Sequence, residues 1–274
     1  MKKAYYILIA CIALLGATYF VIMPDVAALN KTNPKKTSFM RHAEARWIVQ
    51  GKKKKVVQEW VKYSGISPYL VKAVVIAEDD KFYSHEGFDI EAMRVAMEKD
   101  LKAGRLKAGG STISQQLVKN LYLTPEKSAI RKLKEALITW RLEIALPKRR
   151  ILEIYLNVVE WGDGIYGAEA ASRHYFGKAA VDLTPMEAAR LAVVLPSPRR
   201  LNPAGEQSYV KARAELIYGI MQRRGIVPQE YLEAGEDEPA RDAALPDAAP
   251  GNSPQKTTLP ASPAEAASFA ASGG

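Results

Sequence analysis

The sequence contains a single cysteine, Cys11, among its 274 residues, so no disulfide can form within the chain. It also has only three histidines, and no spacing typical of metal ligands joins them. An HExxH helix, paired cysteines and an EF-hand loop are all missing. Convincing runs of alternating apolar and polar residues, which are typical of strands, are missing as well. These absences exclude a disulfide-linked scaffold and direct attention to helices and carboxylates.

The sequence does have an uncharged apolar run near its start, over residues 5–23. As a helix, this run would span about 28 Å, close to the thickness of the hydrocarbon layer of a membrane. A cleaved signal peptide is the alternative, but its apolar core is usually about 7–15 residues long and ends at small residues. We therefore predict a transmembrane helix over 5–23, after a cytoplasmic N-terminus at 1–4. Lysines on both sides of the run leave its orientation open.

The rest of the chain divides by composition into three parts. Residues 24–64 form a polar, membrane-proximal connector. Residues 65–234 have a helical pattern almost throughout and form the predicted globular domain. Residues 235–274 are rich in alanine, proline, serine and glycine, and they lack the apolar content that would offset the entropy of ordering. We predict that this last part is a disordered tail.

The predicted domain contains several sequence signals for the starts of helices. Ser67 precedes a proline and is expected to cap the first helix. Thr112 with Gln115 and Thr184 with Glu187 have the spacing of a capping box, in which two side chains satisfy the free backbone groups of a helix start. These residues predict helices that begin at 68, 113 and 185.

Positive charge is concentrated in one segment of the chain. The formal net charge is +9, and residues 99–150 alone hold 13 Lys and Arg against 4 Asp and Glu, an excess as large as that of the whole chain. Such a segment suits nucleic acid, an anionic membrane surface or a phosphorylated substrate. Because a membrane helix is predicted, nucleic acid fits least, and we expect none as a partner.

Glu78 is the first candidate for catalysis. At helical spacing it falls on the apolar side of its helix with three valines, and it lies at the helix C-terminus beside Asp79. Apolar surroundings and nearby negative charge raise the pKa of a carboxyl group, which suits a general acid or base. The alternative is an ordinary helix-end glutamate paired with Lys72 or Lys81.

The stretch GRLKAGGS, residues 104–111, nearly fits a nucleotide-binding P-loop, but Gly110 stands where that motif has its lysine. ATP is therefore a poor candidate ligand. What remains is a glycine turn with a hydroxyl at Ser111 that leads into a helix, an arrangement that often binds an anion. The alternative is a capped turn without a ligand. His85, near a turn with Gly87 after it, fits a structural hydrogen-bonding role better than that of a metal ligand.

Glu135 is the second candidate acid, on a helix that ends before Pro147. Five apolar residues form a stripe along this helix, and Glu135 lies almost diametrically opposite. The simple interpretation is a solvated contact with Arg131 of little energy. However, Ile138 and Leu142 share the side of Glu135, so this side is expected to be partly covered, and a carboxylate among cations then fits a divalent-ion or phosphate site. The stripe consists of Ile130, Leu133, Leu137, Trp140 and Ile144, and the cations are Lys127, Arg131 and Lys134.

Five sequence blocks between residues 71 and 195 resemble, in the same order, those of the monofunctional peptidoglycan glycosyltransferases. The same catalytic module occurs in bifunctional penicillin-binding proteins. The blocks are EDDKFYSHEG, GGSTISQQLVKN, RKLKE, RILEIYLN, and GIYGAEAASRHYFGK with LTPMEAARLA. Ser114 stands where threonine is commoner in the family, a mild departure. No block resembling a penicillin-binding domain follows, so we expect the monofunctional branch.

This resemblance implies a mainly α, lysozyme-like fold with two lobes around a cleft near the membrane. The implied location is the bacterial inner membrane, with the catalytic domain (residues 65–234) in the periplasm. The implied reaction polymerises lipid II into β-1,4-linked glycan strands and releases undecaprenyl diphosphate. By matching position, Glu78 would take the proton from the acceptor hydroxyl and Glu135 would lie near the diphosphate. No organic cofactor is implied; a divalent ion, Mg or Mn, is often needed, and Glu135 is its candidate ligand.

The matching positions assign further residues by resemblance. Implied to bind the diphosphate are Gly110, Ser111, Lys119, Lys127, Arg131 and Lys134, whereas Gln115, Gln116 and Asn120 would line the cleft. Asp79, Phe82, His85 and Gly87 belong to a motif on the acceptor side or with a structural role. The implied partners are lipid II, the growing strand and the membrane, with cell-division and penicillin-binding proteins as further candidates.

Two other functions stay open from the residues alone. Two carboxylates equally suit glycoside hydrolysis, so a membrane-anchored muramidase or lytic transglycosylase is the alternative enzyme. The surplus of positive charge favours the polymerase, because a departing diphosphate needs stabilisation and a neutral polysaccharide does not. An inactive scaffold that binds lipid II is the third interpretation, and the presence of both Glu78 and Glu135 argues against it.

Overall fold

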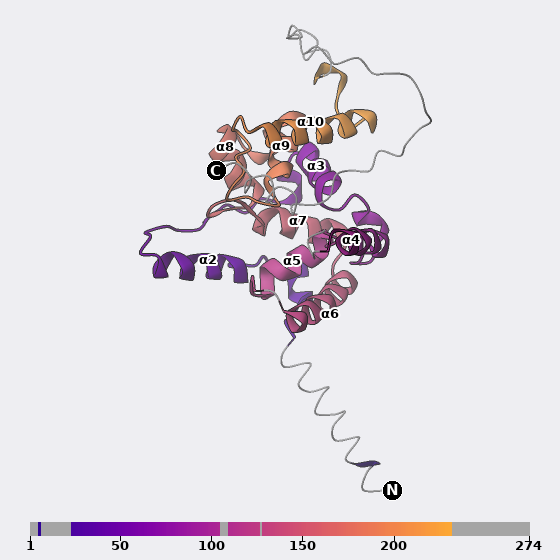
Figure 1. Ribbon diagram of the computed structural model, residues 1–274. Coiled ribbons are helices and arrows are strands. Elements are labelled where there is room, and N and C mark those ends of the chain that lie inside the picture. Colours follow the sequence, from indigo (N-terminus) through magenta and orange to yellow (C-terminus); the bar gives the residue numbers. More distant parts are fainter. Residues whose placement is uncertain (1–4, 7–22, 105–108, 127, 232–274) are drawn as a thin grey trace, which may run out of the picture.

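The computed structural model describes residues 5–6, 23–104, 109–126 and 128–231 (Figure 1). The predicted membrane helix lies largely outside the described residues, as does the predicted tail. Within the described ranges, no helix combines the length and the apolar character needed to cross a membrane. The described part of the chain is mainly helical, as predicted.

The helices follow one another with short connections. Their bounds are α2 (Ser38–Val49), α3 (Pro68–Glu78), α4 (Ile90–Ala103), α5 (Ile113–Tyr122), α6 (Ala129–Ala145), α7 (Lys148–Val158), α8 (Ala168–Phe176), α9 (Pro185–Val194) and α10 (Ser208–Arg223). Short 3-10 helices accompany them: η1 (Ala27–Asn30), η2 (Tyr63–Gly65), η3 (Phe82–Ser84) and η4 (Ala180–Asp182).

The predicted helix starts are confirmed. Ser67 caps α3 by accepting a hydrogen bond from the backbone N of Tyr69. Thr112 and Thr184 each form the expected capping box at α5 and α9. These caps are local, so the sequence alone predicts them well.

A small sheet was not predicted from the sequence. Its strands, β1 (Val57–Gln58), β2 (Glu160–Gly162) and β3 (Ile165–Tyr166), lie in the order β1-β3-β2. The β1 and β3 strands pair in parallel, and β2 pairs with β3 in antiparallel orientation with a register shift. Strands of two or three residues are too short to show an alternating pattern, which explains the missed prediction.

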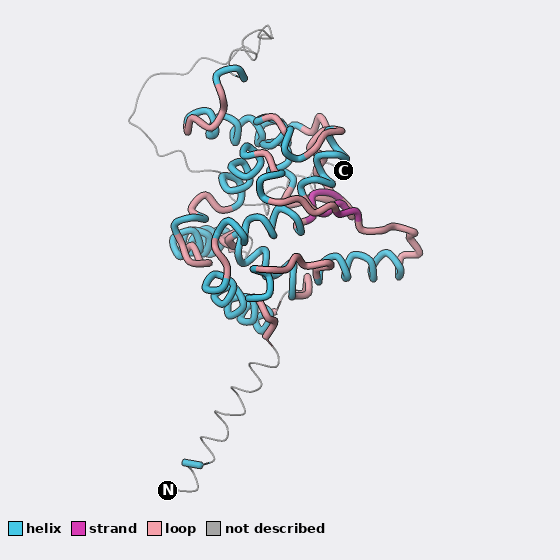
Figure 2. Tube along the Cα trace, turned by 180° about the vertical axis from the view of Figure 1, so that it is seen from behind, coloured by secondary structure: helices cyan, strands magenta, loops and turns pink. Residues whose placement is uncertain are grey.

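The helices gather in two groups with α7 between them (Figures 1 and 2). In one group α3, α9 and α10 pack on one another, and in the other α5 packs on α6 and also on α7. The α7 helix is buried along most of its length, including Ile151, Leu152 and Tyr155. The α7 helix therefore connects α5 and α6, the helix that carries Glu135, to the rest of the core.

The α6 helix buries the side opposite to its apolar stripe. Ile130 and Ile144, at the two ends of the stripe, are 71% and 69% exposed, whereas Glu135 is only 2% exposed. Ile138 and Leu142 are buried beside Glu135, where α6 packs on α5. The side of Glu135 is therefore fully covered rather than partly covered, and the interpretation of Glu135 as a solvated residue is wrong.

Candidate active site

Glu78 is the last residue of α3, and its side chain is partly buried. Gln116 of α5 donates a hydrogen bond from Nε2 to Oε2 of Glu78 at 2.8 Å. Burial is the main reason why the pKa of Glu78 is raised, and the charge of Asp79 adds to it. The Gln116 hydrogen bond and the positive charges of Lys119 and Arg213 act in the opposite direction. A carboxyl group with a raised pKa is suited to accept a proton near neutral pH.

The neighbouring acid, Asp79, is buried and holds two backbone segments together. Its carboxylate accepts hydrogen bonds from Nε2 of His85 at 2.9 Å and from the backbone N of Ile113 at 2.9 Å. The backbone N of Gly87 donates to Nδ1 of His85 at 3.1 Å, so the ring hydrogen lies on Nε2. Because Ile113 begins α5, the anion at this helix start is the protein's own carboxylate. This differs from the substrate anion expected there from the sequence.

The glycine loop before α5 has a packing role. A Cβ atom on Gly110 would lie 3.1 Å from Cα of Met93 and 3.2 Å from Cβ of Ala96, both on α4. Glycine therefore lets the loop approach α4 closely. Ser111 follows as a partly buried residue, while residues 105–108 of the same loop lie outside the described residues.

Lys119 of α5 lies within electrostatic reach of both predicted acids. The negative charges of Glu135 and Glu78 favour its charged form. Burial is the larger effect, and together with the nearby charges of Arg131 and Lys132 it lowers the pKa of Lys119. The structure thus brings the two acids and a group of cations to one region around α5.

Glu135 is held by its own helix. Nη1 of Arg131 donates to Oε2 of Glu135 at 2.8 Å, and Nζ of Lys132 donates to Oε1. Nε of Arg131 is buried and has no hydrogen-bond partner among the described residues. The predicted cation Lys134 is exposed on the surface of α6, and Lys127 lies outside the described residues.

Several residues assigned to the cleft by resemblance make internal contacts. Gln115 is buried and completes the Thr112 cap, and Asn120 is buried and donates to the backbone O of Gln116 at 2.8 Å. Phe82 is buried, with Nζ of Lys148 4.6 Å from its ring centre. A Cβ on Gly87, whose φ is +91°, would lie 2.9 Å from Cγ of Glu143 on α6. These positions support the surrounding structure.

Three residues near the acids were not singled out from the sequence. Tyr155 of α7 donates from its hydroxyl to Oε1 of Gln116 at 3.0 Å. Arg213 of α10 places positive charge near Glu78, and Lys132 contacts Glu135. The sequence could have indicated Tyr155, because this residue belongs to the RILEIYLN block. Arg213 lies outside every matched block, and only the packing of α10 on α3 brings it close.

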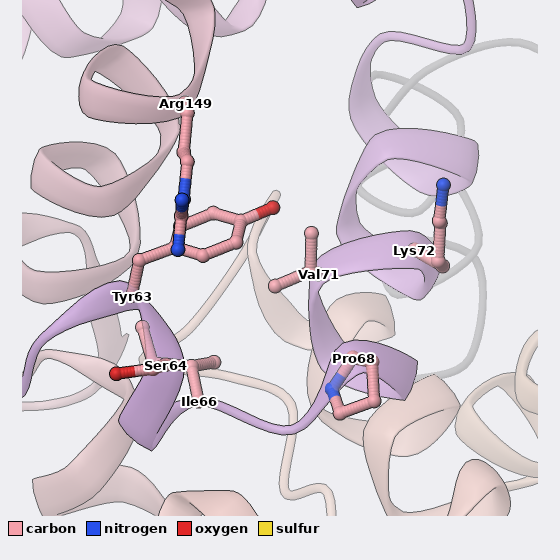
Figure 3. A pocket seen from close by; sticks show the side chains of 7 residues that line it. All are labelled: Tyr63, Ser64, Ile66, Pro68, Val71, Lys72 and Arg149. Carbon is pink, nitrogen blue, oxygen red and sulfur yellow. The ribbon is translucent and has the colours of Figure 1, made fainter.

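A separate cavity of about 300 Å³ opens at the other end of α3 (Figure 3). Arg149 of α7 stands over the ring of Tyr63 on one side of it, and Lys72 and Val71 of α3 stand on the other. Its lining shares no residue with the acids and cations around α5. This cavity is therefore separate from the candidate active site, which lies around the two acids and α5.

Comparison with known protein families gives a match over most of the helical domain. Residues 45–222 match the family model described as transglycosylase. The chain belongs to this family. The match runs from α2 into α10 and includes both acids and the whole of α5.

Curated relatives of this transglycosylase include three that are named biosynthetic peptidoglycan transglycosylase. One from Nitrosospira multiformis is 45% identical over 210 residues, which cover 77% of this chain and 91% of the relative. One from Aromatoleum aromaticum is 50% identical over 200 residues, 73% of this chain and 87% of the relative. One from Dechloromonas aromatica is 56% identical over 169 residues, 61% of this chain and 72% of the relative.

Proposed function

We propose that this peptidoglycan glycosyltransferase polymerises lipid II and releases undecaprenyl diphosphate. The observation that carries the proposal is the position of Lys119 on α5, because Gln116 of the same helix binds Glu78 and α6, which carries Glu135, packs on it. The charges of both acids favour the charged form of Lys119. A carboxyl suited to accept a proton and a group of cations suited to a departing anion thus lie in one region. The two helix groups on either side of α7 are then the two lobes of a lysozyme-like fold, with the cleft between them.

Glu78 acts as the general base. The acceptor 4-hydroxyl gives its proton to Glu78 while its oxygen attacks the anomeric carbon of the donor. The new C–O bond forms as the bond from that carbon to the diphosphate oxygen breaks, with inversion of configuration. The pKa of Glu78, raised mainly by burial, makes it a stronger base than an exposed glutamate.

The cations around Glu135 receive the departing diphosphate. Lys119 carries a partly buried charge, and Nε of Arg131 is a buried donor without a partner among the described residues. Glu135 orients this group, because it binds Arg131 and Lys132 and keeps their side chains in place. Fixed donors of this kind stabilise developing negative charge more than solvent does.

The resemblance implies Glu135 as the ligand of a divalent ion, but the surroundings of Glu135 suit that role poorly. Both oxygens of Glu135 already accept hydrogen bonds from cations. Within the described ranges, no three His, Cys, Asp or Glu side chains gather as a metal site. The ion would add positive charge beside Lys119 and Arg131.

Replacing Lys119 with alanine is expected to lower the turnover of lipid II by about 10²–10³-fold, the usual effect of removing one fixed donor to a developing anion. Thermal stability should stay equal or rise, because burial lowers the pKa of Lys119, so its charge opposes folding. Steady-state polymerisation of labelled lipid II and a thermal melt measure the two effects.

The matched control is Lys53→Ala, which removes one exposed lysine of the connector. It should leave the rate per molecule unchanged. A Lys119→Ala protein with a lower melting temperature and a normal rate per folded molecule would contradict the assignment.

We also propose that the exposed stripe of α6 rests in the surface of the membrane that carries lipid II, with the chain anchored there by residues 5–23. Trp140 and Leu133 of the stripe are 55% and 63% exposed, and Ile90 and Leu101 of α4 are exposed as well. An apolar surface of this kind marks an interaction site on a soluble domain. The 3-10 helix η1, which follows the predicted anchor, packs on α6, so the anchor would enter the membrane close to this helix.

Fluorescence quenching tests this membrane contact. In vesicles that contain brominated phospholipid, the full chain should lose tryptophan emission, and Trp140→Phe should remove most of that loss. The control is Trp60→Phe, a partly buried tryptophan packed against Arg150. Equal quenching in the Trp140→Phe protein and the unchanged chain would rule the contact out.

Supplying purified lipid II separates the polymerase from the alternative enzymes. A polymerase makes long glycan strands from lipid II, and moenomycin, an inhibitor of this family, should stop it. A muramidase or lytic transglycosylase would act only on finished strands, and an inactive scaffold would bind lipid II without turnover.

A further inference from the structure

The buried side chain of Tyr155 is connected to Glu78 through a single amide. The hydroxyl of Tyr155 donates to Oε1 of Gln116 at 3.0 Å, and Nε2 of Gln116 donates to Oε2 of Glu78 at 2.8 Å. We propose that Tyr155 is a positioning residue for the catalytic base and acts by fixing the orientation of the Gln116 amide. The inference rests on the proposed role of Glu78 as the base.

The chemistry of the three groups allows one arrangement. An ionised carboxylate only accepts hydrogen bonds, so the NH₂ end of Gln116 must face Glu78. The carbonyl end then faces Tyr155 and needs a donor, which the hydroxyl supplies. Burial raises the pKa of Tyr155 well above its ordinary value, so the hydroxyl keeps its hydrogen throughout the working range of pH. A Tyr155→Phe change would keep the ring but leave the side-chain amide of Gln116 free to exchange the positions of its oxygen and nitrogen.

Loss of this orientation changes the proton affinity of Glu78. The hydrogen bond from Gln116 lowers the pKa of Glu78 against the larger effect of burial. Other charges face the same carboxyl: Lys119 from α5 and Arg213 from α10 lower its pKa, and Asp79, directly after α3, raises it. These charges remain in a Tyr155→Phe protein, so the only expected change is that the Gln116 hydrogen bond no longer lowers the pKa of Glu78. The pKa of Glu78 should then rise further.

The sign of the effect on rate follows directly. A base works only when ionised, so a higher pKa moves the acidic limb of the pH–rate profile to higher pH. The loss of rate should be largest at acidic pH and should diminish as the pH is raised. A role of Tyr155 in packing alone would lower the rate equally at every pH.

The experiment measures kcat and KM for lipid II across pH with the full chain. For Tyr155→Phe we expect kcat to fall about three- to tenfold at neutral pH, the effect of one hydrogen bond, with KM unchanged. The matched control is Tyr166→Phe, because Tyr166 is also wholly buried but lies near Glu160 and Arg199 rather than Glu78. Its pH profile should coincide with that of the unchanged chain.

A second variant keeps the inference testable if the first one folds poorly. Gln116→Ala removes the amide from a partly buried position and should shift the acidic limb in the same direction. When Tyr155→Phe is combined with Gln116→Ala, it should not shift the acidic limb of the pH–rate profile any further, because both changes act on the same two hydrogen bonds. Additive shifts, or a pH-independent loss in Tyr155→Phe, would overturn the inference. Full activity of Glu78→Gln would instead overturn the proposed base, which keeps the two failures distinct.

Discussion

Replacing Glu78 with glutamine is expected to reduce polymerisation of lipid II by at least about 10²–10⁴-fold, the usual contribution of a general base. Glutamine has nearly the same shape but cannot take a proton at working pH, and Gln116 can still donate to its amide oxygen. The fold should therefore persist while the chemistry stops. Incorporation of labelled lipid II, measured per folded molecule, checks this result.

The stability of the same protein provides an independent check. Burial raises the pKa of Glu78 above its unfolded value, so the folded state binds more protons than the unfolded state between these two values. Stability due to this group is thus lost as the pH rises through that interval. The Glu78→Gln protein should melt at a higher temperature than the unchanged chain at neutral pH, and the difference should shrink in acid.

Glu86→Gln is the control for both measurements. Glu86 is an exposed acid eight residues along the chain, so its replacement should change neither the rate nor the melting temperature. An active Glu78→Gln protein would remove the basis for the proposed base, whatever its stability.

Replacing Asp79 with alanine is expected to cost about 3 kcal/mol of folding free energy. The change removes an acceptor for Nε2 of His85 and for the backbone N of Ile113, and both donors lie in buried surroundings. The start of α5 would lose its anion, and of the hydrogen bonds among the described residues only that from Gln116 to Glu78 would still join the end of α3 to α5. Denaturant unfolding, with the slope of the transition compared between proteins, measures the loss.

Asp80→Ala is the matched control for this prediction. Asp80 pairs with Arg224 through two hydrogen bonds of 2.5 and 2.8 Å, but both side chains are largely exposed. An exposed pair usually contributes less than about 1 kcal/mol. Equal losses of folding free energy in the two alanine variants would show that the buried contacts of Asp79 stabilise the fold no more than the exposed Asp80–Arg224 pair does.

Local signals in the sequence predicted the helix starts correctly. A serine before a proline, or a threonine three residues before a glutamine or glutamate, satisfies free backbone groups within one turn, and no distant part of the chain is needed. The helical class and both candidate acids were likewise found from spacing and motif. The sheet of β1, β2 and β3 was missed, because its strands are too short to carry a pattern.

The contacts of the individual site residues were harder to predict. The sequence pattern singled out Lys134 near Glu135, but Lys132 makes the contact, because residues three apart share one face of a helix whereas adjacent residues do not. It also left Tyr155 and Arg213 aside, although both lie near Glu78 in the folded protein. Motif matching indicates which residue types are needed but not which atoms meet.

The sequence by itself determined the helical class, the helix caps, the family and the pair of acids on separate helices, because these depend on short-range spacing. Only the tertiary structure decided that Asp79 occupies the start of α5, that α6 buries its charged side, and that Tyr155 reaches Glu78 through Gln116. The physical reason is that a stripe of apolar residues looks the same whether a protein core or a membrane covers it. Which side of α6 is buried depends on α5, η1 and α7, which pack against it.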